Sequence, residues 1–213
     1  MGDTLPVCFA AFRPTLEAFV GRRYGNAEIM ATFGPSEEGI MQRLVPDRWE
    51  ACLAAYLEAY EREHGRCTAP FPGLEGAFEL LRARGAALAI VTGKGAVSAA
   101  VSLRQLGVGR YFDVVETGSP VGGIKPASIR KVLVRWGARP DEVAYVGDAA
   151  ADVDAAKEAG VIALAAAWAS TARADELEAR RPLATFSTVA DFIAWIEANV
   201  KATPGSPDQG RAI

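Results

Sequence analysis

The chain has 213 residues and a mass of 22.5 kDa, and 50% of its residues are hydrophobic, which is enough to bury an α/β core and a small second module. A net charge of −3 and a pI near 5.4 exclude the basic surface that nonspecific nucleic-acid binding needs. The apolar runs are far shorter than the roughly 20 residues that cross a bilayer, so no membrane partner is expected. Three cysteines without CxxC spacing, and no signal-peptide pattern at Met1, predict a reduced, cytoplasmic protein.

The first part of the chain, residues 6–70, contains several helix-like stretches and no convincing strand. Its clearest helix follows Asp47, an expected N-cap with Glu50 at the third helical position, and Gly65 is expected to end it. One face of this helix carries large apolar residues at helical spacing, namely Trp49, Leu53, Tyr56, Leu57 and Tyr60. We therefore predict a helical module, inserted near the N-terminus, over residues 6–70.

From Ala86 onward, short apolar runs alternate with helix-period segments, which is typical of βα units that build a parallel sheet. Strands are expected at residues 87–91, 114–116, 143–146, 162–166 and 185–186, with helices between them. The predicted fold class is therefore α/β, with a Rossmann-like parallel-sheet core over residues 71–201. Residues 202–213 have almost nothing to bury, and we expect them to be disordered.

Two carboxylates four residues apart, Asp148 and Asp152, follow the strand expected at residues 143–146. Ligands of open parallel sheets bind beyond the carboxyl ends of the strands, so Asp148 is expected at the site and Asp152 at the start of the next helix, facing it. Mg²⁺ is typically held by one or two carboxylates together with waters and phosphate, which makes both residues candidate metal ligands. For this motif alone, the alternative stays open that Asp148 merely ends a strand and Asp152 caps a helix.

Two further motifs suit an anion. The strand that ends at Val91 leads into Thr92-Gly93-Lys94-Gly95, which places a hydroxyl and unobstructed N–H groups at a helix N-terminus, where a phosphate is favoured. The other motif, Gly122-Gly123-Ile124-Lys125-Pro126, sets a lysine at the start of a helix, where it can neutralise an anion. Alone, each motif also fits a simpler reading, since Thr92 can be an ordinary N-cap and most single lysines are merely solvated.

In this order, on successive βα units, the three motifs resemble the haloacid dehalogenase-like hydrolase superfamily, and the phosphoglycolate phosphatase-like branch is most similar. The resemblance covers roughly residues 2–198 and includes the phrase from Gly73 to Gly85. It implies an enzyme in which an aspartate attacks phosphorus to form an aspartyl-phosphate, which water then hydrolyses.

The resemblance also implies roles for the motif residues. Thr92 and the Gly93 N–H would hold the transferring phosphoryl group, and Lys125 would offset its charge. Asp148 would bind Mg²⁺, while Asp152 would orient Lys125 or a metal-bound water. These roles suit phosphoryl transfer, which depends mostly on positioning and charge stabilisation.

The beginning of the chain departs from the family pattern. The family's first motif is a strand ending in Asp-x-Asp-Gly-Thr-Leu, and residues 1–5 resemble only a remnant that follows the catalytic pair. The nucleophile is therefore expected upstream of Met1, and the chain as written is expected to be inactive. Asp3 is a poor substitute because no strand precedes it.

In the family the missing strand lies in the middle of the sheet, so its loss leaves two neighbouring strands with unpaired backbone groups, which are costly when buried. We expect the native product to start upstream of Met1. A shortened chain and a true pseudoenzyme are the alternatives.

The helical module has the position of this branch's cap, which closes over the phosphate site and reads the leaving group. The candidate substrate-binding residues are Gly93, Lys94 and Arg43, and the turn-rich stretch at residues 34–39 is a further candidate. The simpler alternative is that Glu37 and Glu38 begin a solvated helix and that Arg43 lies on the surface.

The sequence as a whole predicts an Mg²⁺-dependent phosphatase, monomeric or homodimeric, that acts on a small phosphorylated metabolite such as phosphoglycolate. A phosphomutase or a dehalogenase on the same fold is an alternative, and a non-catalytic phosphate-binding protein is an alternative of another class. His64 is the only histidine and is expected at the surface, which argues against histidine-dependent triads.

Overall fold

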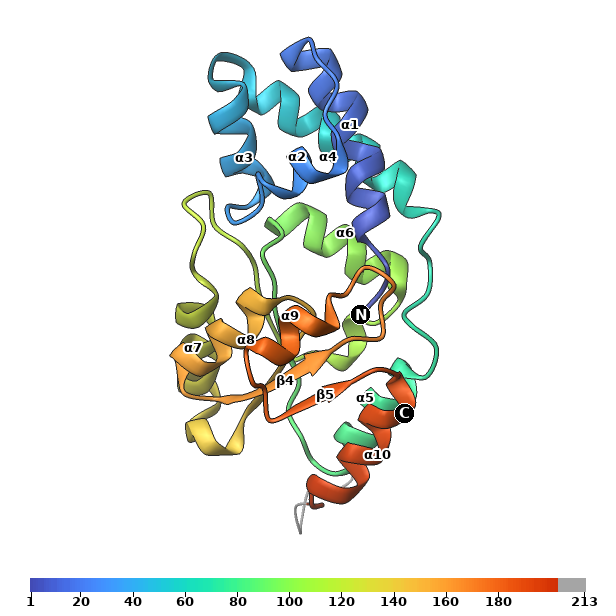
Figure 1. The fold of residues 1–213 in the computed structure, drawn as a ribbon, viewed down its shortest axis with the longest axis vertical. Helices are drawn as coiled ribbons and strands as arrows, with labels where there is room; N and C mark the ends of the chain where they lie inside the picture. The colour runs from blue at the N-terminus through green and yellow to red at the C-terminus, as the bar shows by residue number, and fades with distance from the viewer. Residues whose placement is uncertain (203–213) are drawn as a thin grey trace, which may run out of the picture.

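The computed structural model describes residues 1–202, and the expected disordered tail lies outside them except for Ala202. A group of helices from the N-terminal part of the chain stands above an α/β body (Figure 1). The strands pair in parallel, so the predicted α/β fold class is confirmed. Over residues 1–202, no helix combines the length and the apolar character that a membrane span requires.

The helical part consists of α1 (Leu5–Val20), α2 (Asn26–Met30), α3 (Glu37–Leu44) and α4 (Trp49–His64). Helices α1 and α4 lie against each other, and the ring centroids of Phe12 on α1 and Tyr56 on α4 are 4.3 Å apart. Within α4, the centroids of Tyr56 and Tyr60 are 5.7 Å apart. The apolar stripe expected on the helix from residue 49 therefore forms much of this small core. We refer to residues 5–64 as the cap.

Two expectations about α4 are wrong. Asp47 does not cap the helix, because Pro46 starts a short 3₁₀ turn (Pro46–Arg48) and Arg48 takes the N-cap position; proline with its fixed φ favours such a first turn. His64 is not on the surface but fully buried, edge-on to Tyr60 with ring centroids 5.3 Å apart. It lies one helical turn after Tyr60 and therefore on the same buried face.

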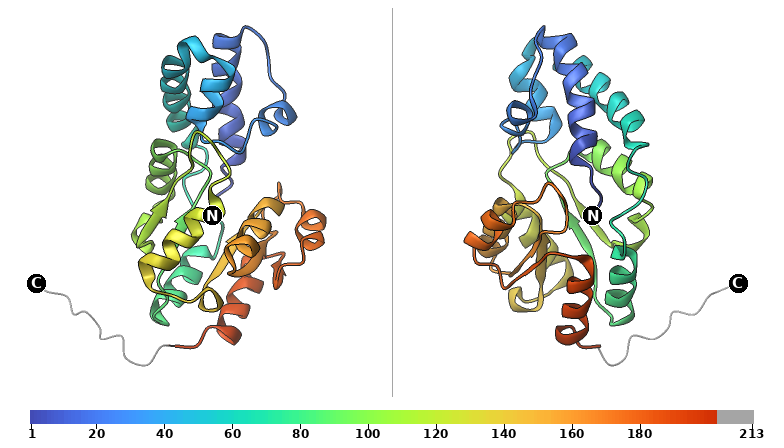
Figure 2. Two further views of the ribbon diagram at one scale, coloured as in Figure 1. Left: turned by 90° about the vertical axis from the view of Figure 1, so that its left-hand side faces the viewer. Right: turned by 45° about the vertical axis from the view of Figure 1, so that its right-hand side comes forward.

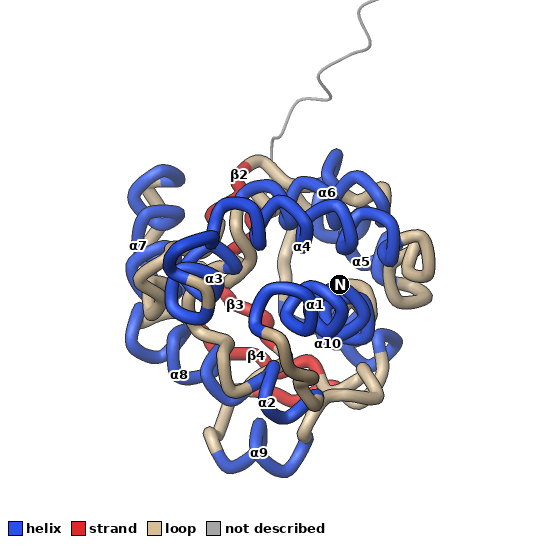
Figure 3. The backbone as a smooth tube through the Cα atoms, turned by 90° about the horizontal axis from the view of Figure 1, so that it is seen from above, coloured by secondary structure: helices blue, strands red, loops and turns tan. Residues whose placement is uncertain are grey.

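The α/β body alternates helices and strands along the chain. Its elements are α5 (Leu74–Ala83), β1 (Ala89–Val91), α6 (Ala96–Leu106), β2 (Val114–Glu116), α7 (Lys125–Trp136), β3 (Ala144–Gly147), α8 (Ala150–Ala159), β4 (Ile162–Ala166), α9 (Ala174–Ala179), β5 (Ala184–Phe186) and α10 (Val189–Asn199), with 3₁₀ turns at Gly109–Tyr111 and Pro140–Glu142. Seen from above, the strands run between α7 and α8 on one side and α5, α6 and α10 on the other (Figure 3).

Strand β4 shows why both faces are covered. Leu164 belongs to the apolar cluster with α5 and α10, whereas Ala163 and Ala165 belong to the cluster with α7 and α8. Side chains alternate between the two faces of a strand, so a run of apolar residues is what a strand buried on both sides requires.

The strands form two sheets and not one. Strand β1 pairs with β2, with Ala89 opposite Val114, and the second sheet has the order β3-β4-β5, with Ala144 opposite Ile162. Within residues 1–202, β1 and β3 do not pair with each other. The division falls between the two strands on which the expected phosphate and metal motifs lie.

Candidate active site

The loop after β1 is held by backbone hydrogen bonds to the loop after β2. Thr92 N–H donates to the Glu116 carbonyl at 3.0 Å, and Gly118 N–H donates to the Lys94 carbonyl at 2.7 Å. Lys94 N–H donates to the Thr92 hydroxyl oxygen at 3.2 Å. Thr92 is not the N-cap of α6, since Gly95 has that position, so its side chain instead shapes the loop.

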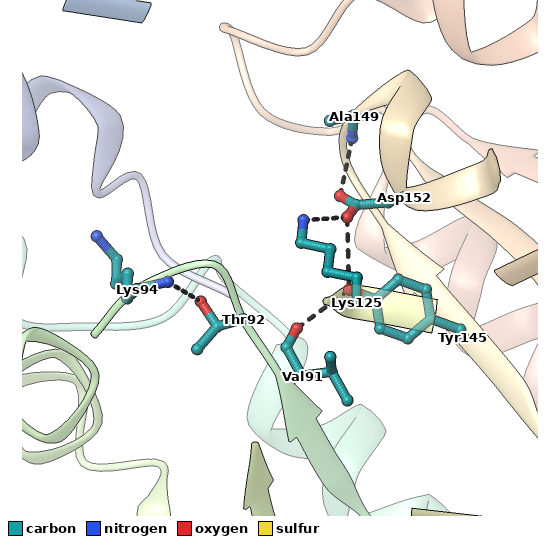
Figure 4. Close-up of polar contacts among 7 residues, drawn as sticks. All are labelled: Val91, Thr92, Lys94, Lys125, Tyr145, Ala149 and Asp152. Carbon is teal, nitrogen blue, oxygen red and sulfur yellow. Dashed lines mark hydrogen bonds and ion pairs between the residues drawn. The ribbon is translucent and has the colours of Figure 1, made fainter. Parts of the chain in front are cut away.

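Lys125 and Asp152 form an ion pair across the first turns of α7 and α8 (Figure 4). The Asp152 side chain is buried, whereas that of Lys125 is 31% exposed. Asp152 also accepts a hydrogen bond from Ala149 N–H at 3.2 Å. Gly147 permits this arrangement, because a Cβ at that position would collide with the Asp152 side chain.

Tyr145 connects the two sheets and is not among the residues predicted from the sequence. Its hydroxyl lies 3.0 Å from the Val91 carbonyl of β1 and 3.4 Å from Asp152 Oδ1. Burial, with the nearby carboxylates of Asp152 and Asp148, raises the pKa of Tyr145 well above its usual range. A tyrosine within a short apolar strand was the available signal, because a buried phenol needs a hydrogen-bond partner.

These contacts bring most of the predicted residues to one edge of the body. A hydrogen-bonded chain runs from Val91, next to Thr92, through Tyr145 to Asp152 and Lys125. Asp148 follows β3 directly and is exposed.

Asp148 and Asp152 differ in how available their carboxylates are to bind a metal ion. Within residues 1–202, no group of three or more His, Cys, Asp or Glu side chains could by itself hold a metal ion. Both oxygens of Asp152 already have partners in Lys125 and Ala149, whereas Asp148 stands open at the strand end. A single open carboxylate fits Mg²⁺, which takes its other ligands from water and phosphate.

Lys94 extends away from the Lys125–Asp152 pair (Figure 4) and toward the cap. Its ammonium lies 3.2 Å from Cys8 Sγ on α1 and 4.6 Å from the ring centroid of Tyr60 on α4. Burial alone would lower the pKa of Lys94, but Cys8, Tyr60 and Glu37 together raise it above its ordinary value. Lys94 is therefore a cation at neutral pH, located where cap and core meet.

Arg43 is not gathered with the other candidates. It lies on α3, and its guanidinium donates to the Thr32 carbonyl at 2.9 Å, which ties two parts of the cap together.

Glu37, by contrast, is not a solvated helix start. Its side chain is buried and accepts hydrogen bonds from Gly95 N–H at 2.6 Å and from the Ser98 hydroxyl at 2.7 Å, both on the core side. No local pattern in the sequence signals these partners.

Comparison with known proteins places this geometry in a family. The family model of haloacid dehalogenase-like hydrolases matches residues 1–166. The chain belongs to this family. Pyrophosphatase PpaX from Halalkalibacterium halodurans is 29% identical over 161 residues, 75% of each chain, and a phosphoglycolate phosphatase from Synechococcus elongatus is 31% identical over 136 residues, 62% of this chain and 63% of the relative.

Solved structures of other proteins share the fold. A hydrolase from Pseudomonas syringae superposes with a TM-score of 0.78 at 21% identity, covering 94% of this chain and 95% of the other. A haloacid dehalogenase-like hydrolase from Streptococcus pneumoniae gives 0.73 at 23% identity, covering 92% and 93%. The predictions of the superfamily, its phosphatase-like branch and a hydrolase are confirmed.

Proposed function

We propose that the protein hydrolyses a phosphate monoester of a small metabolite, phosphoglycolate or a similar compound, with Mg²⁺ as cofactor. The observation that carries this proposal is the hydrogen-bonded chain from the end of β1 through Tyr145 to the Lys125–Asp152 pair. It sets a hydroxyl, an ammonium and an open carboxylate at one edge of the body, which are the groups that phosphoryl transfer uses.

Each residue then has a distinct role. The Thr92 hydroxyl and the Gly93 N–H hold the phosphoryl oxygens, and Lys125 offsets their charge. Asp152 positions Lys125, with which it forms an ion pair, and both of its oxygens already accept hydrogen bonds. Asp148 is the proposed ligand of Mg²⁺, which supplies neutralisation of the phosphate charge.

The proposed nucleophile is an aspartate on a further strand that would lie between β1 and β3. Support comes from the division of the sheet at that place, where β1 and β3 each have one unpaired edge among the described residues. In this mechanism the aspartate attacks phosphorus, the bond to the leaving oxygen breaks, and water hydrolyses the aspartyl-phosphate.

Pyrophosphate is the second candidate substrate. It is favoured by the relative from Halalkalibacterium halodurans, whose name gives it as a pyrophosphatase and which matches three quarters of the chain. Both candidates require the same edge of the body, where Thr92, Lys125, Asp148 and Asp152 lie and which we call the phosphate edge. They differ only in the leaving group.

The test is phosphate release by the native gene product from phosphoglycolate and from pyrophosphate, with Mg²⁺ and with a chelator. We expect Asp148→Asn to lower Mg²⁺-dependent turnover by at least about 100-fold, because the metal loses its proposed carboxylate. Asp154→Asn is the matched control, since Asp154 lies on α8 but is half-exposed and paired with Arg180. Turnover that survives chelation, or that Asp148→Asn leaves unchanged, would refute the assignment.

A further inference from the structure

Glu37 places a carboxylate of the cap against the core. The side chain is 6% exposed, and its oxygens accept hydrogen bonds from Gly95 N–H and the Ser98 hydroxyl at the start of α6. The first N–H groups of a helix carry partial positive charge and favour an anion. The carboxylate of Glu37 therefore provides the negative charge that the N-terminus of α6 favours.

Neighbouring backbone contacts fix Glu37 in this place. Ser36 N–H donates to the Ser119 carbonyl at 2.9 Å, and Gly39 lies so close to the backbone of Pro120 that a Cβ would collide with it. The start of α3 is thus pressed onto the loop that follows β2. The Glu37 carboxylate leaves the site only if cap and core separate.

This junction also holds a cation. Lys94 supplies a positive charge beside Cys8 and Tyr60, and within residues 1–202 it forms no ion pair with a carboxylate at 4 Å or less. Glu37 is near enough to raise the pKa of Lys94. One cation and one anion therefore lie near each other where cap and core meet, on the loop after β1 and against it.

A buried hydroxyl without a partner lies at the same junction. Tyr56 is fully buried, and its hydroxyl has no hydrogen-bond partner within the described part of the chain. Burial, together with Cys8 and Glu37, raises the pKa of Tyr56, so the phenol keeps its proton and adds no charge to this junction.

We propose that Glu37 determines specificity by disfavouring leaving groups that carry more than one negative charge. This inference rests on the proposed function and decides between its two candidate substrates. A single carboxylate is offset by Lys94, whereas the second phosphate of pyrophosphate brings additional negative charge that Glu37 repels. The protein is therefore a phosphatase for monophosphates with a weakly charged polar leaving group.

The test compares two stable ligands of similar shape, phosphonoacetate and methylenediphosphonate, by calorimetric titration in the presence of Mg²⁺. Both present a phosphonate to the phosphate edge, but the second group is a carboxylate in one and a more highly charged phosphonate in the other. We expect the wild type to bind phosphonoacetate about tenfold more tightly, since Glu37 repels the additional negative charge of methylenediphosphonate.

Glu37→Gln keeps the size of the side chain and an acceptor for Gly95 N–H while removing the charge. We expect it to shift the ratio of the two dissociation constants by about tenfold toward methylenediphosphonate. Glu58→Gln, at an exposed glutamate on α4, is the control and leaves the ratio unchanged.

Three outcomes would overturn the inference while leaving the proposed function intact: tighter binding of methylenediphosphonate by the wild type, an unchanged ratio in Glu37→Gln, or an equal shift in Glu58→Gln. The wild-type comparison needs no variant, so tighter binding of methylenediphosphonate overturns the inference even if Glu37→Gln fails to fold. Failure of the wild type to bind either ligand with Mg²⁺ would instead overturn the proposed function and the inference with it.

Discussion

The phosphate edge of the core and the junction of cap and core are fixed in different ways. Thr92 and Asp148 come directly after strands, and Lys125 begins a helix, so their positions follow from local structure. Glu37, Lys94 and Cys8 come from three segments and meet only when the cap folds onto the core. In the function that we propose, the edge holds the groups that any phosphate requires, whereas the junction holds those that distinguish one leaving group from another.

This difference implies that the two regions respond to different changes. A substitution at the edge should affect every phosphorylated ligand alike. A substitution at the junction should change the ranking of ligands and leave binding of the common phosphate largely intact. The predictions that follow test this division, beginning with the largest effect.

Lys125→Met should harm both stability and phosphate binding. It leaves the buried carboxylate of Asp152 without its cation, and breaking a buried pair costs about 3 kcal/mol, reduced here because Lys125 is partly exposed. We expect a loss of about 2 kcal/mol in the free energy of unfolding, measured with urea, and loss of affinity for both phosphonates.

The control for this change is Lys131→Met on the same helix. The Lys131 side chain is 67% exposed, and its ammonium forms a weak surface ion pair with a Glu116 oxygen at 3.6 Å. Its loss should therefore change the free energy of unfolding by less than about 0.5 kcal/mol. A selective loss of only one phosphonate in Lys125→Met would contradict the division between edge and junction.

Gly118→Ala should disturb both regions through one loop. Gly118 N–H donates to the Lys94 carbonyl, and a Cβ there would collide with the Gly93 carbonyl. The loop that carries Thr92 and Lys94 must then move, at a cost of about 2 kcal/mol. Thermal unfolding measures the cost, and titration with both phosphonates measures the loss of affinity.

Gly76→Ala is the matched control, because Gly76 lies inside α5 with open space around its Cα. Alanine there should stabilise the helix by about 0.5–1 kcal/mol. An equal change of stability in both variants would show that the close approach of Gly118 to Gly93 does not destabilise Gly118→Ala.

The smallest expected effect concerns pH and the buried end of α4. Burial lowers the pKa of His64 from its ordinary value of 6.5, so below that pH the unfolded chain binds a proton that the folded protein does not. Stability should therefore fall as the pH drops from 7.5 to 5.5, by linkage of proton binding to unfolding. His64→Phe should show a weaker decline, and equal slopes of unfolding free energy against pH would argue against a neutral, buried His64.

The sequence was informative where local structure places the residue. Each predicted strand is present within two residues at either end, since turns and apolar runs determine where short buried strands begin and end. Thr92, Lys125, Asp148 and Asp152 were selected for the same reason. Asp47 failed as an N-cap because Pro46, which precedes it, starts a different turn.

The rest depended on packing between distant segments. Glu37 reads as an ordinary acidic residue at the start of a helix, and only the contact of α3 with the loop after β2 buries it. Tyr145 reads as one more residue of an apolar strand, yet its hydroxyl reaches the neighbouring sheet. Such partners are fixed by tertiary structure, about which spacing along one chain carries no information.

The connection between cap and core has a mechanical consequence. Both views in Figure 2 place the start of the chain where the cap meets the body, and Phe71 N–H donates to the Met1 carbonyl at 2.9 Å, so the segment that enters the cap lies beside the one that leaves it. Two adjacent connections of this kind are typical of a hinge between two parts of a protein. A movement of the cap about these connections would separate Glu37 from Gly95 and Ser98, whereas the proposed phosphate edge lies wholly within the body and would keep its arrangement.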